Sequence, residues 1–253
     1  MKATSMLLTI ILFCVVHLSN TNAQGKNEQL WICGEETVKP AFIDEYLKLS
    51  KEFIELCKKE KFPFAFYTWT SKPFVYELWY PVNTLNDWTE IEKAWDKVTE
   101  KFGADKYAAF NNTKVKNRSY SMSIRNDLQY IPKNPDYQRD ELVFVRFVEY
   151  SLMPGKTLEF EKEVKWMNSQ RDSSGVGHFV LYGTGGVGYD NPVYVEMIGA
   201  KNQEDFVTRI GVLSDKMASP LKEYRSRIYS LTREMKEYDW WMLPDLSYQP
   251  AGN

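Results

Sequence analysis

The sequence predicts an α+β protein made of two tandem units, each with the element order β-α-β-β-α-β. The first observation behind this prediction is a faint internal repeat between residues 30–137 and 142–248. The matching segments occur in the same order in both halves, and the number of residues between partners changes only gradually along the chain. A repeat of about a hundred residues has the size of a small domain rather than of a solenoid unit. The matching segments include Glu35–Pro40 with Glu149–Pro154, Tyr67 with Tyr182, Asp87-Trp88 with Asp205-Phe206, and Tyr120 with Tyr229.

The second observation is the pattern of apolar residues, which gives the same elements in each half. In the first half, Pro40 suits the first turn of a helix, where its missing N–H costs nothing. From Phe42 to Cys57 the apolar residues recur largely at three- and four-residue spacing, which is typical of a helix with one buried face. Asn86 or Asp87 can cap a second helix. The predicted elements are strand 30–34, helix 40–57, strand 64–69, strand 74–80, helix 87–95 and strand 119–124.

The second half repeats this order, with predicted strand 142–149, a helix opened by Pro154, strands 178–182 and 193–198, helix 205–217 and strand 227–231. The order is that of the split β-α-β, or ferredoxin-like, motif. By this alignment the first unit carries nine extra residues before its last strand, around Asn111–Thr113. Each unit also ends in an aromatic, proline-containing tail. We expect each tail to cover the sheet edge of the other unit, because a bare edge invites aggregation.

The first 23 residues have the features of a secretory signal peptide. Lys2 supplies a positive start, Met6–Val16 is apolar, and Thr21–Ala23 ends the segment with small residues at the cleavage position. An uncleaved anchor is the alternative, although the apolar run is shorter than the roughly 20 residues that a spanning helix needs. The predicted organisation is therefore a leader at 1–23 and units at 24–138 and 139–253, exported to the periplasm or the extracellular space, with no membrane span after cleavage.

Composition excludes several classes of function. The formal charge of −2 becomes −3 without the leader, which leaves no electrostatic footprint for nucleic acid. Only His178 remains of the two histidines, so most zinc sites and multi-histidine centres are excluded, and no metal site is predicted. Cys33 and Cys57 remain as well. Export permits a disulfide between them, but their apolar surroundings favour two buried thiols.

Two such units in one chain resemble the dimeric α+β barrel superfamily, in which two ferredoxin-like sheets face each other with their helices outside. The resemblance covers nearly the whole chain after the leader and rests on element order and duplication. It implies a pseudo-dimeric barrel, as a monomer or a weak homodimer, with a pocket in each unit between sheet and helices. The superfamily includes antibiotic-biosynthesis-type, haem-degrading and quinone-forming monooxygenases and chlorite-dismutase-like haem proteins, so the resemblance makes haem a candidate cofactor. The haem-degrading members use an Asn, Trp and His set, and no predicted helix of this chain carries a histidine.

Arg146 interrupts an otherwise apolar strand, and an unpaired buried arginine would be very costly. In the ferredoxin-like order the first and third strands of a unit are neighbours, so Arg146 is predicted to meet Glu196. The pair would position an anion or act in acid–base chemistry, or it would be purely structural. His178 is a candidate axial haem ligand or general base, with a solvent-facing or capped strand end as the alternative. The glycine-rich segment 183–188 lacks a following helix, so it is predicted to be a hairpin connection that could cover a pocket.

The predicted site lies in the second unit. Its walls would come from Trp166, Tyr182 and Tyr194, with Arg146, Glu196 or His178 as polar contacts. The first unit has Ile32 and Leu78 in place of the two charges, so its pocket should be filled by its own side chains, including Trp31 and Trp79. The function predicted from these features is binding of a small aromatic or apolar ligand without a standard catalytic motif. The alternative is a haem-dependent or cofactor-free monooxygenase-like enzyme.

Overall fold

The computed structural model describes residues 28–133, 137, 141–175 and 177–250, so the predicted leader at 1–23 lies outside the described residues. The first unit contains β1 (Glu28–Val38), α1 (Ile43–Lys59), β2 (Tyr67–Lys72), β3 (Val75–Val82), α2 (Asp87–Phe102), α3 (Ala104–Asn112) and β4 (Lys114–Arg125). The second unit contains β5 (Phe144–Leu152), α4 (Thr157–Ser174), β6 (Phe179–Gly185), β7 (Val193–Ala200), α5 (Gln203–Lys216), α6 (Ala218–Leu231) and β8 (Thr232–Met242). The predicted β-α-β-β-α-β order is confirmed in both units.

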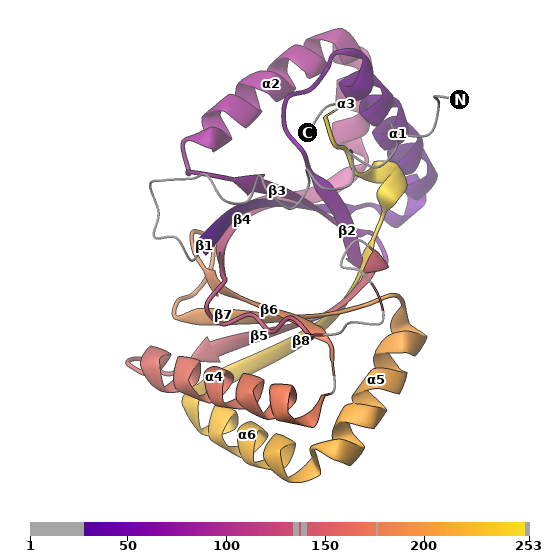
Figure 1. Ribbon diagram of the computed structural model, residues 1–253. Helices are drawn as coiled ribbons and strands as arrows, with labels where there is room; N and C mark the ends of the chain where they lie inside the picture. Colours follow the sequence, from indigo (N-terminus) through magenta and orange to yellow (C-terminus); the bar gives the residue numbers. More distant parts are fainter. Residues whose placement is uncertain (1–27, 134–136, 138–140, 176, 251–253) are drawn as a thin grey trace, which may run out of the picture.

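The eight strands form a closed barrel in the order β1-β3-β2-β8-β5-β7-β6-β4. Each unit contributes four adjacent strands, and the two sheets join at short β2–β8 and β4–β6 pairings. Helices α1–α3 cover one side of the barrel and α4–α6 the opposite side (Figure 1). The predicted α+β fold, with two sheets facing each other inside a shell of helices, is therefore confirmed within a single chain.

The pleat of each strand divides its side chains between two cores, because successive residues point to opposite faces. One set points into the barrel, where residues of both units form a shared, tryptophan-rich cluster that includes Trp69, Trp79, Phe147 and Trp240. The alternate set points outward under the helices and forms a separate core in each unit. The outward-facing side chains determine whether space remains between each sheet and its helices.

The predicted last strand of the first unit, 119–124, lies within β4, but the end of the second unit was predicted incorrectly. Residues 227–231 belong to helix α6 rather than to a strand, and the last strand is β8, which follows them directly. The buried residues Tyr224, Ile228 and Leu231 have helical spacing, which a five-residue window hides. Tyr229 therefore does not correspond to Tyr120 on β4. The predicted nine-residue insertion in the first unit is also wrong. Each unit has an additional helix directly before its last strand, α3 in the first unit and α6 in the second.

The tails cross between units as predicted. Phe66 in the first unit pairs with Tyr248 near the end of the chain, and Tyr130 pairs with Val180 in the second unit. The Tyr248 hydroxyl also donates a hydrogen bond to the carbonyl oxygen of Phe62 at 2.9 Å. Each unit therefore completes the sheet edge of the other, which ties the two halves together.

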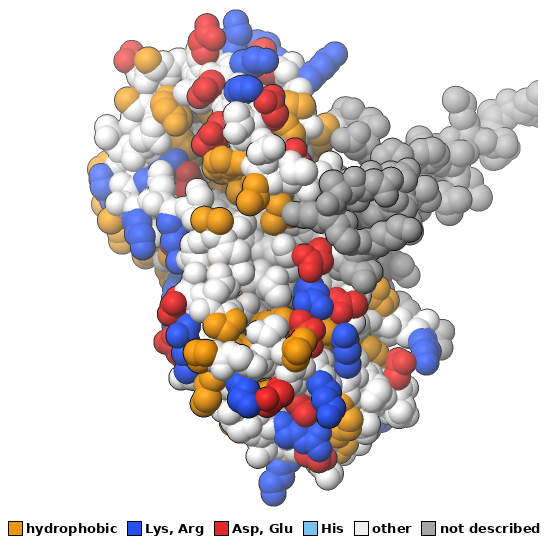
Figure 2. All heavy atoms as spheres, turned by 90° about the vertical axis from the view of Figure 1, so that its left-hand side faces the viewer, with side chains coloured by type: hydrophobic (Ala, Val, Ile, Leu, Met, Phe, Trp, Pro, Cys, Tyr) orange, Lys and Arg blue, Asp and Glu red, His pale blue; other side chains and the backbone are white. Residues whose placement is uncertain are grey.

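Cys33 and Cys57 are both free and buried, which confirms the prediction of two thiols. On the face shown in Figure 2, acidic and basic side chains are interspersed over the two helical layers. Among the described residues, no helix combines the length and the apolar character needed to cross a bilayer.

Candidate functional site

Arg146 does not meet Glu196, so the predicted pair is wrong. Its guanidinium binds Asp239 on the neighbouring strand β8 and approaches Glu237 at 3.3 Å. Strand register explains the difference, because Arg146 lies opposite Ile198 on one side and Asp239 on the other. The Arg146 side chain is also 28 % exposed rather than buried.

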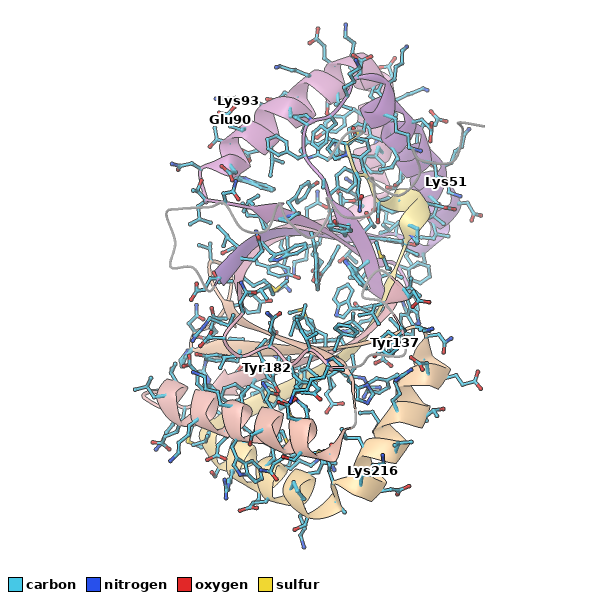
Figure 3. The ribbon with its side chains drawn as sticks, in the orientation of Figure 1. Lys51, Glu90, Lys93, Tyr137, Tyr182 and Lys216 are labelled. Carbon is cyan, nitrogen blue, oxygen red and sulfur yellow. The ribbon has the colours of Figure 1, made fainter. Side chains whose placement is uncertain are left out.

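Glu196 has different partners, all of them buried. Arg171 on α4 places its Nη2 atom 3.2 Å from Oε1 of Glu196, while Tyr182 and Tyr150 donate hydrogen bonds of 2.6 and 2.7 Å to the carboxylate. Tyr224 lies 3.4 Å from the Tyr182 hydroxyl, and Tyr182 itself sits between the sheet and α4 (Figure 3). Burial raises the pKa of Tyr150, Tyr182 and Tyr224. This network fills the space that the sequence predicted to be a pocket.

The remaining predicted site residues do not converge on one opening. Tyr194 is buried and donates a hydrogen bond to Glu161. Trp166 packs partly buried against the second-unit core, and its ring lies 4.7 Å from the Arg227 guanidinium carbon. The glycine-rich segment packs against β4, where the Gly186 N–H donates to the Ser121 carbonyl at 2.8 Å. These contacts are structural, and ligand binding by this set stays a prediction.

His178 is only 3 % exposed, so the expectation of a solvent-facing histidine is wrong. It lies just before β6 with its ring 6.2 Å from that of Phe206. Neither ring nitrogen has a well-aligned hydrogen-bond partner among the described residues, although the backbone of Arg209 lies close. Burial, followed by the positive charge of Arg171, lowers the pKa of His178 to about 4. The imidazole is therefore neutral at physiological pH.

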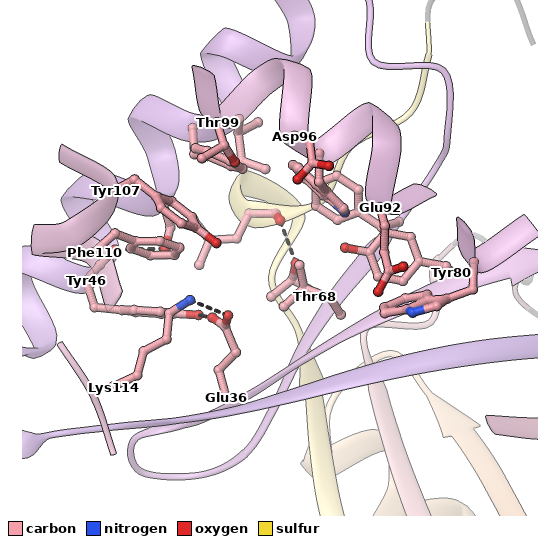
Figure 4. Close-up of a pocket in the computed structure, with 18 residues that line it drawn as sticks. Glu36, Tyr46, Thr68, Tyr80, Glu92, Asp96, Thr99, Tyr107, Phe110 and Lys114 are labelled. Atoms are coloured by element: carbon pink, nitrogen blue, oxygen red, sulfur yellow. Dashed lines mark hydrogen bonds and ion pairs between the residues drawn. The ribbon is translucent and has the colours of Figure 1, made fainter. Parts of the chain in front are cut away.

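A cavity of about 440 Å³ lies in the first unit, between its sheet and helices α1–α3. Its aromatic walls include Phe53, Phe66, Tyr80, Trp88, Trp95 and Phe110. Its polar lining consists of Glu36, Tyr46, Ser50, Thr68, Glu92, Asp96, Thr99, Tyr107 and Lys114 (Figure 4). The prediction that Trp31 and Trp79 fill this space is wrong, because both point into the barrel instead.

The cavity lies above three residues that are paired side by side across neighbouring strands of the first sheet and that have small or apolar side chains. Leu78 on β3 lies between Gly34 on β1 and Thr68 on β2. In the second unit the same row reads Val148, Glu196 and Tyr182, and it is filled by the buried network. A Cβ atom added to Gly34 would meet no heavy atom within 4 Å. A glycine inside a strand was the sequence signal that could have located this opening.

One end of the cavity holds an ion pair between Lys114 and Glu36. The Tyr46 hydroxyl donates a 2.8 Å hydrogen bond to Glu36, and the Lys114 ammonium lies 3.9 Å from the centre of the Phe110 ring. Burial and the adjacent Glu36 carboxylate raise the pKa of Tyr46, so this phenol stays protonated. The three groups form a rigid polar wall in which the positive and negative charges compensate each other.

The opposite wall comes from α2. Trp88, Glu92, Trp95, Asp96 and Thr99 all line the cavity, and their spacing of three or four residues places them on one side of the helix. Glu92 and Asp96 are exposed at the cavity mouth and form no ion pair within the described part of the chain. Figure 4 shows both carboxylates on the helix above Thr68 and Tyr80.

A buried glutamate, Glu77, lies inside the barrel. Glu77 on β3 is 2 % exposed and accepts hydrogen bonds from the Trp79 indole, at 2.7 Å, and from the Tyr120 hydroxyl. Burial raises its pKa to about 7, and its two donors only partly oppose this. The interior of the barrel therefore contains a carboxyl group whose charge changes near neutral pH.

Several solved structures resemble this chain. An anthrone oxidase-like protein matches with a TM-score of 0.57 and 12% identity, covering 89% of this chain and 94% of its own. A candidate monooxygenase from Fusobacterium nucleatum matches with a TM-score of 0.56 and 12% identity, over 88% and 98% of the two chains. A chlorite dismutase variant from Candidatus Nitrospira defluvii matches at 0.53 and 8% identity, over 86% and 92%.

No protein-family model and no curated protein matches the sequence. The structural matches confirm the predicted resemblance at the level of the fold, which is that of the dimeric α+β barrels.

Haem, the cofactor suggested by the resemblance, does not fit the cavity. The lining contains no histidine, cysteine or methionine that could serve as an axial ligand. Of its three tyrosines, Tyr46 already donates its proton to Glu36. Burial raises the pKa of Tyr80 and so disfavours a phenolate, and Tyr107 is 39% exposed. His178 is buried in the other unit beside Phe206. Within the residues that the structure describes, no cluster of three or more metal-ligating side chains was found either.

Proposed function

We propose that this protein binds a small aromatic or apolar molecule in the first-unit cavity, rather than in the second unit. The supporting observation is the row Gly34, Leu78 and Thr68, which leaves open the space that the second unit fills with Glu196 and Tyr182. A volume of about 440 Å³ falls within the usual range for ligand pockets, roughly 300–1,000 Å³. Aromatic walls with a few fixed polar groups are also typical of such pockets.

The duplication supports this proposal, because the packing under the helices of the first unit can be compared with that of the second. Both units bury the same kind of sheet face under the same arrangement of helices. In the second unit this space is filled by larger side chains in the same row of the sheet together with Arg171, Tyr150 and Tyr224. An open cavity reduces packing contacts and so lowers stability, which favours a use for it in binding.

Filling the cavity tests the proposal directly. Gly34→Leu introduces a side chain where the structure has open space, and Gly211→Ala on the exposed face of α5 is the matched glycine control. The probe is N-phenyl-1-naphthylamine, a neutral apolar dye that fluoresces when it is removed from water. We expect the wild type and Gly211→Ala to bind it, and Gly34→Leu to bind it at least about tenfold more weakly.

Dye binding that is unchanged in Gly34→Leu, or absent from the wild type, would contradict the proposal. Far-UV circular dichroism of each variant separates loss of binding from loss of fold.

The monooxygenase-like alternative stays a second candidate, favoured by the fold shared with an anthrone oxidase-like protein. Anthrone is therefore a suitable probe for it. Oxidation by O₂ would convert anthrone to anthraquinone with release of water, and the product is followed by absorbance. Turnover that Gly34→Leu abolishes would establish catalysis in the cavity. Turnover no faster than the uncatalysed reaction would leave ligand binding as the function.

We further propose that the protein is exported after removal of residues 1–23. The basic, apolar and small-residue regions of that segment support this proposal. Expression of the full chain with a C-terminal tag, followed by N-terminal sequencing of the secreted product, tests it. An N-terminus at Gln24 is expected, whereas retention of Met1 would contradict it.

A further inference from the structure

We propose that the ligand of the first-unit cavity is a small organic cation, namely a protonated amine attached to an aromatic or aliphatic body. This inference rests on the proposed function and specifies its ligand class. It combines two features of the cavity, an unbalanced negative charge at the mouth and a wall of aromatic rings behind it.

The charges of the lining do not balance. Glu36 is compensated by Lys114, with which it forms an ion pair. Glu92 and Asp96 lack such a partner in the described structure, and nearby Lys93 on α2 pairs with Glu90 on the outer side of the helix (Figure 3). The mouth of the cavity therefore carries two carboxylates that form no direct ion pair with a side-chain cation of the described chain.

The two carboxylates are close enough along α2 to repel each other. Glu92 and Asp96 are four residues apart on α2, and like charges at this spacing repel each other and destabilise a helix. A cation bound between them would remove this repulsion and form charge-assisted hydrogen bonds, which are about twice as strong as neutral ones. An anionic ligand would be repelled by both groups.

The aromatic wall suits the rest of such a molecule. The ring of Trp95 lies 5.2 Å from that of Phe53 and 5.4 Å from that of Phe66, and the ring of Tyr80 lies 6.1 Å from that of Trp88. Trp88 is one helical turn before Glu92. An ammonium group held by Glu92 would therefore lie near an indole, and tryptophan is the side chain whose ring face attracts cations best.

This arrangement gives the ligand a defined orientation. The amine stays at the mouth with Glu92 and Asp96, and its apolar body extends past Trp95 toward Leu78, the lining residue that lies opposite Gly34 in the sheet. The wall of Glu36, Tyr46 and Lys114 closes the far end with groups that already satisfy one another. Specificity for a positive charge thus comes from α2 alone.

Three probes of nearly the same shape and different charge test the inference: 2-phenylethylamine, 2-phenylethanol and 3-phenylpropionate. Binding to the purified protein is measured at pH 7 by titration calorimetry and by quenching of tryptophan fluorescence. We expect the amine to bind roughly tenfold or more tightly than the alcohol, and the carboxylate to bind most weakly. Raising the salt concentration should weaken amine binding only, because the mouth is exposed to solvent.

Charge-neutralising variants locate the effect. In Glu92→Gln/Asp96→Asn we expect amine affinity to fall to that of the alcohol, while alcohol affinity stays the same. Glu90→Gln, which removes a carboxylate from the outer side of α2, is the matched control and should change neither affinity.

The outcomes separate this inference from the proposed function. If all three probes bind equally and Gly34→Leu abolishes their binding, the cavity is a ligand site but the cation preference is refuted. If Gly34→Leu leaves the binding of every probe unchanged, the proposed function itself fails. An amine preference that survives Glu92→Gln/Asp96→Asn would refute the assignment of these two carboxylates.

Discussion

Arg171 on α4 and Glu196 on β7 form an ion pair beneath the second helical layer, with Nη2 and Oε1 3.2 Å apart and side chains only 6% and 5% exposed. The carboxylate also accepts hydrogen bonds from Tyr150 and Tyr182. A buried charge left without its partner is strongly unfavourable, so the loss of either member of this pair would destabilise the second unit.

Removal of the arginine should therefore destabilise the protein. We expect Arg171→Met to lower the free energy of unfolding by about 3–5 kcal/mol, because Glu196 would remain buried without a counter-ion. Urea denaturation at pH 7 measures the change. Arg146→Met is the control, since the 28 % exposed Arg146 pairs with Asp239 nearer the solvent, and its effect should be clearly smaller. Equal losses from the two substitutions would contradict this account.

His178 should make stability depend on acidity. Its pKa in the folded protein, about 4, lies below the ordinary value of 6.5, so the unfolded chain takes up the proton first as pH falls. The stability linked to neutral His178 is present above about pH 6.5 and is lost progressively toward pH 4. At pH 5 the loss should approach about 2 kcal/mol.

Unfolding curves of wild type and His178→Gln at pH 7 and pH 5 isolate this contribution. The variant should lose less stability than the wild type over that interval, because its amide does not titrate. The same pH dependence in both proteins would show that His178 is not responsible.

Glu77 should act in the opposite direction. Its folded-state pKa of about 7 lies above the ordinary 4.5, so the unfolded chain releases the proton first as pH rises. Stability is lost between about pH 4.5 and 7, and by pH 8 the loss should reach about 3 kcal/mol. Glu77→Gln stays neutral, so between pH 5 and pH 8 it should lose about 2 kcal/mol less than the wild type. Thermal unfolding at the two pH values checks this, and a wild-type-like dependence in the variant would be contrary evidence.

The C-terminal tail should stabilise the first unit. Tyr248 is 5% exposed, bridges Phe66 through the backbone, and donates its hydroxyl proton to the Phe62 carbonyl. Truncation of a large buried aromatic side chain to alanine typically costs about 3–5 kcal/mol, so Tyr248→Ala should be destabilised by that order. Gln249→Ala, at an exposed neighbouring position, serves as control. A Tyr248→Ala melting temperature equal to that of the control would show that the tail contributes little.

Local pattern was enough to predict much of the fold. The three- and four-residue spacing from Phe42 to Cys57 predicted α1, and the apolar runs predicted most strands, because these signals depend on residues near one another in the chain. Helix α6 was missed because only Tyr224, Ile228 and Leu231 taken together reveal its period.

The sequence by itself determined the duplication, most of the strand and helix order and the two buried thiols, since each depends on composition or periodicity. The tertiary structure decided which charges meet. Arg146 and Glu196 lie on neighbouring strands, but register and pleat direct one to Asp239 and the other to Arg171. It also decided where the first-unit cavity lies, because the open space beside Gly34 depends on Leu78, Thr68 and the helices above them, which only folding brings to one place.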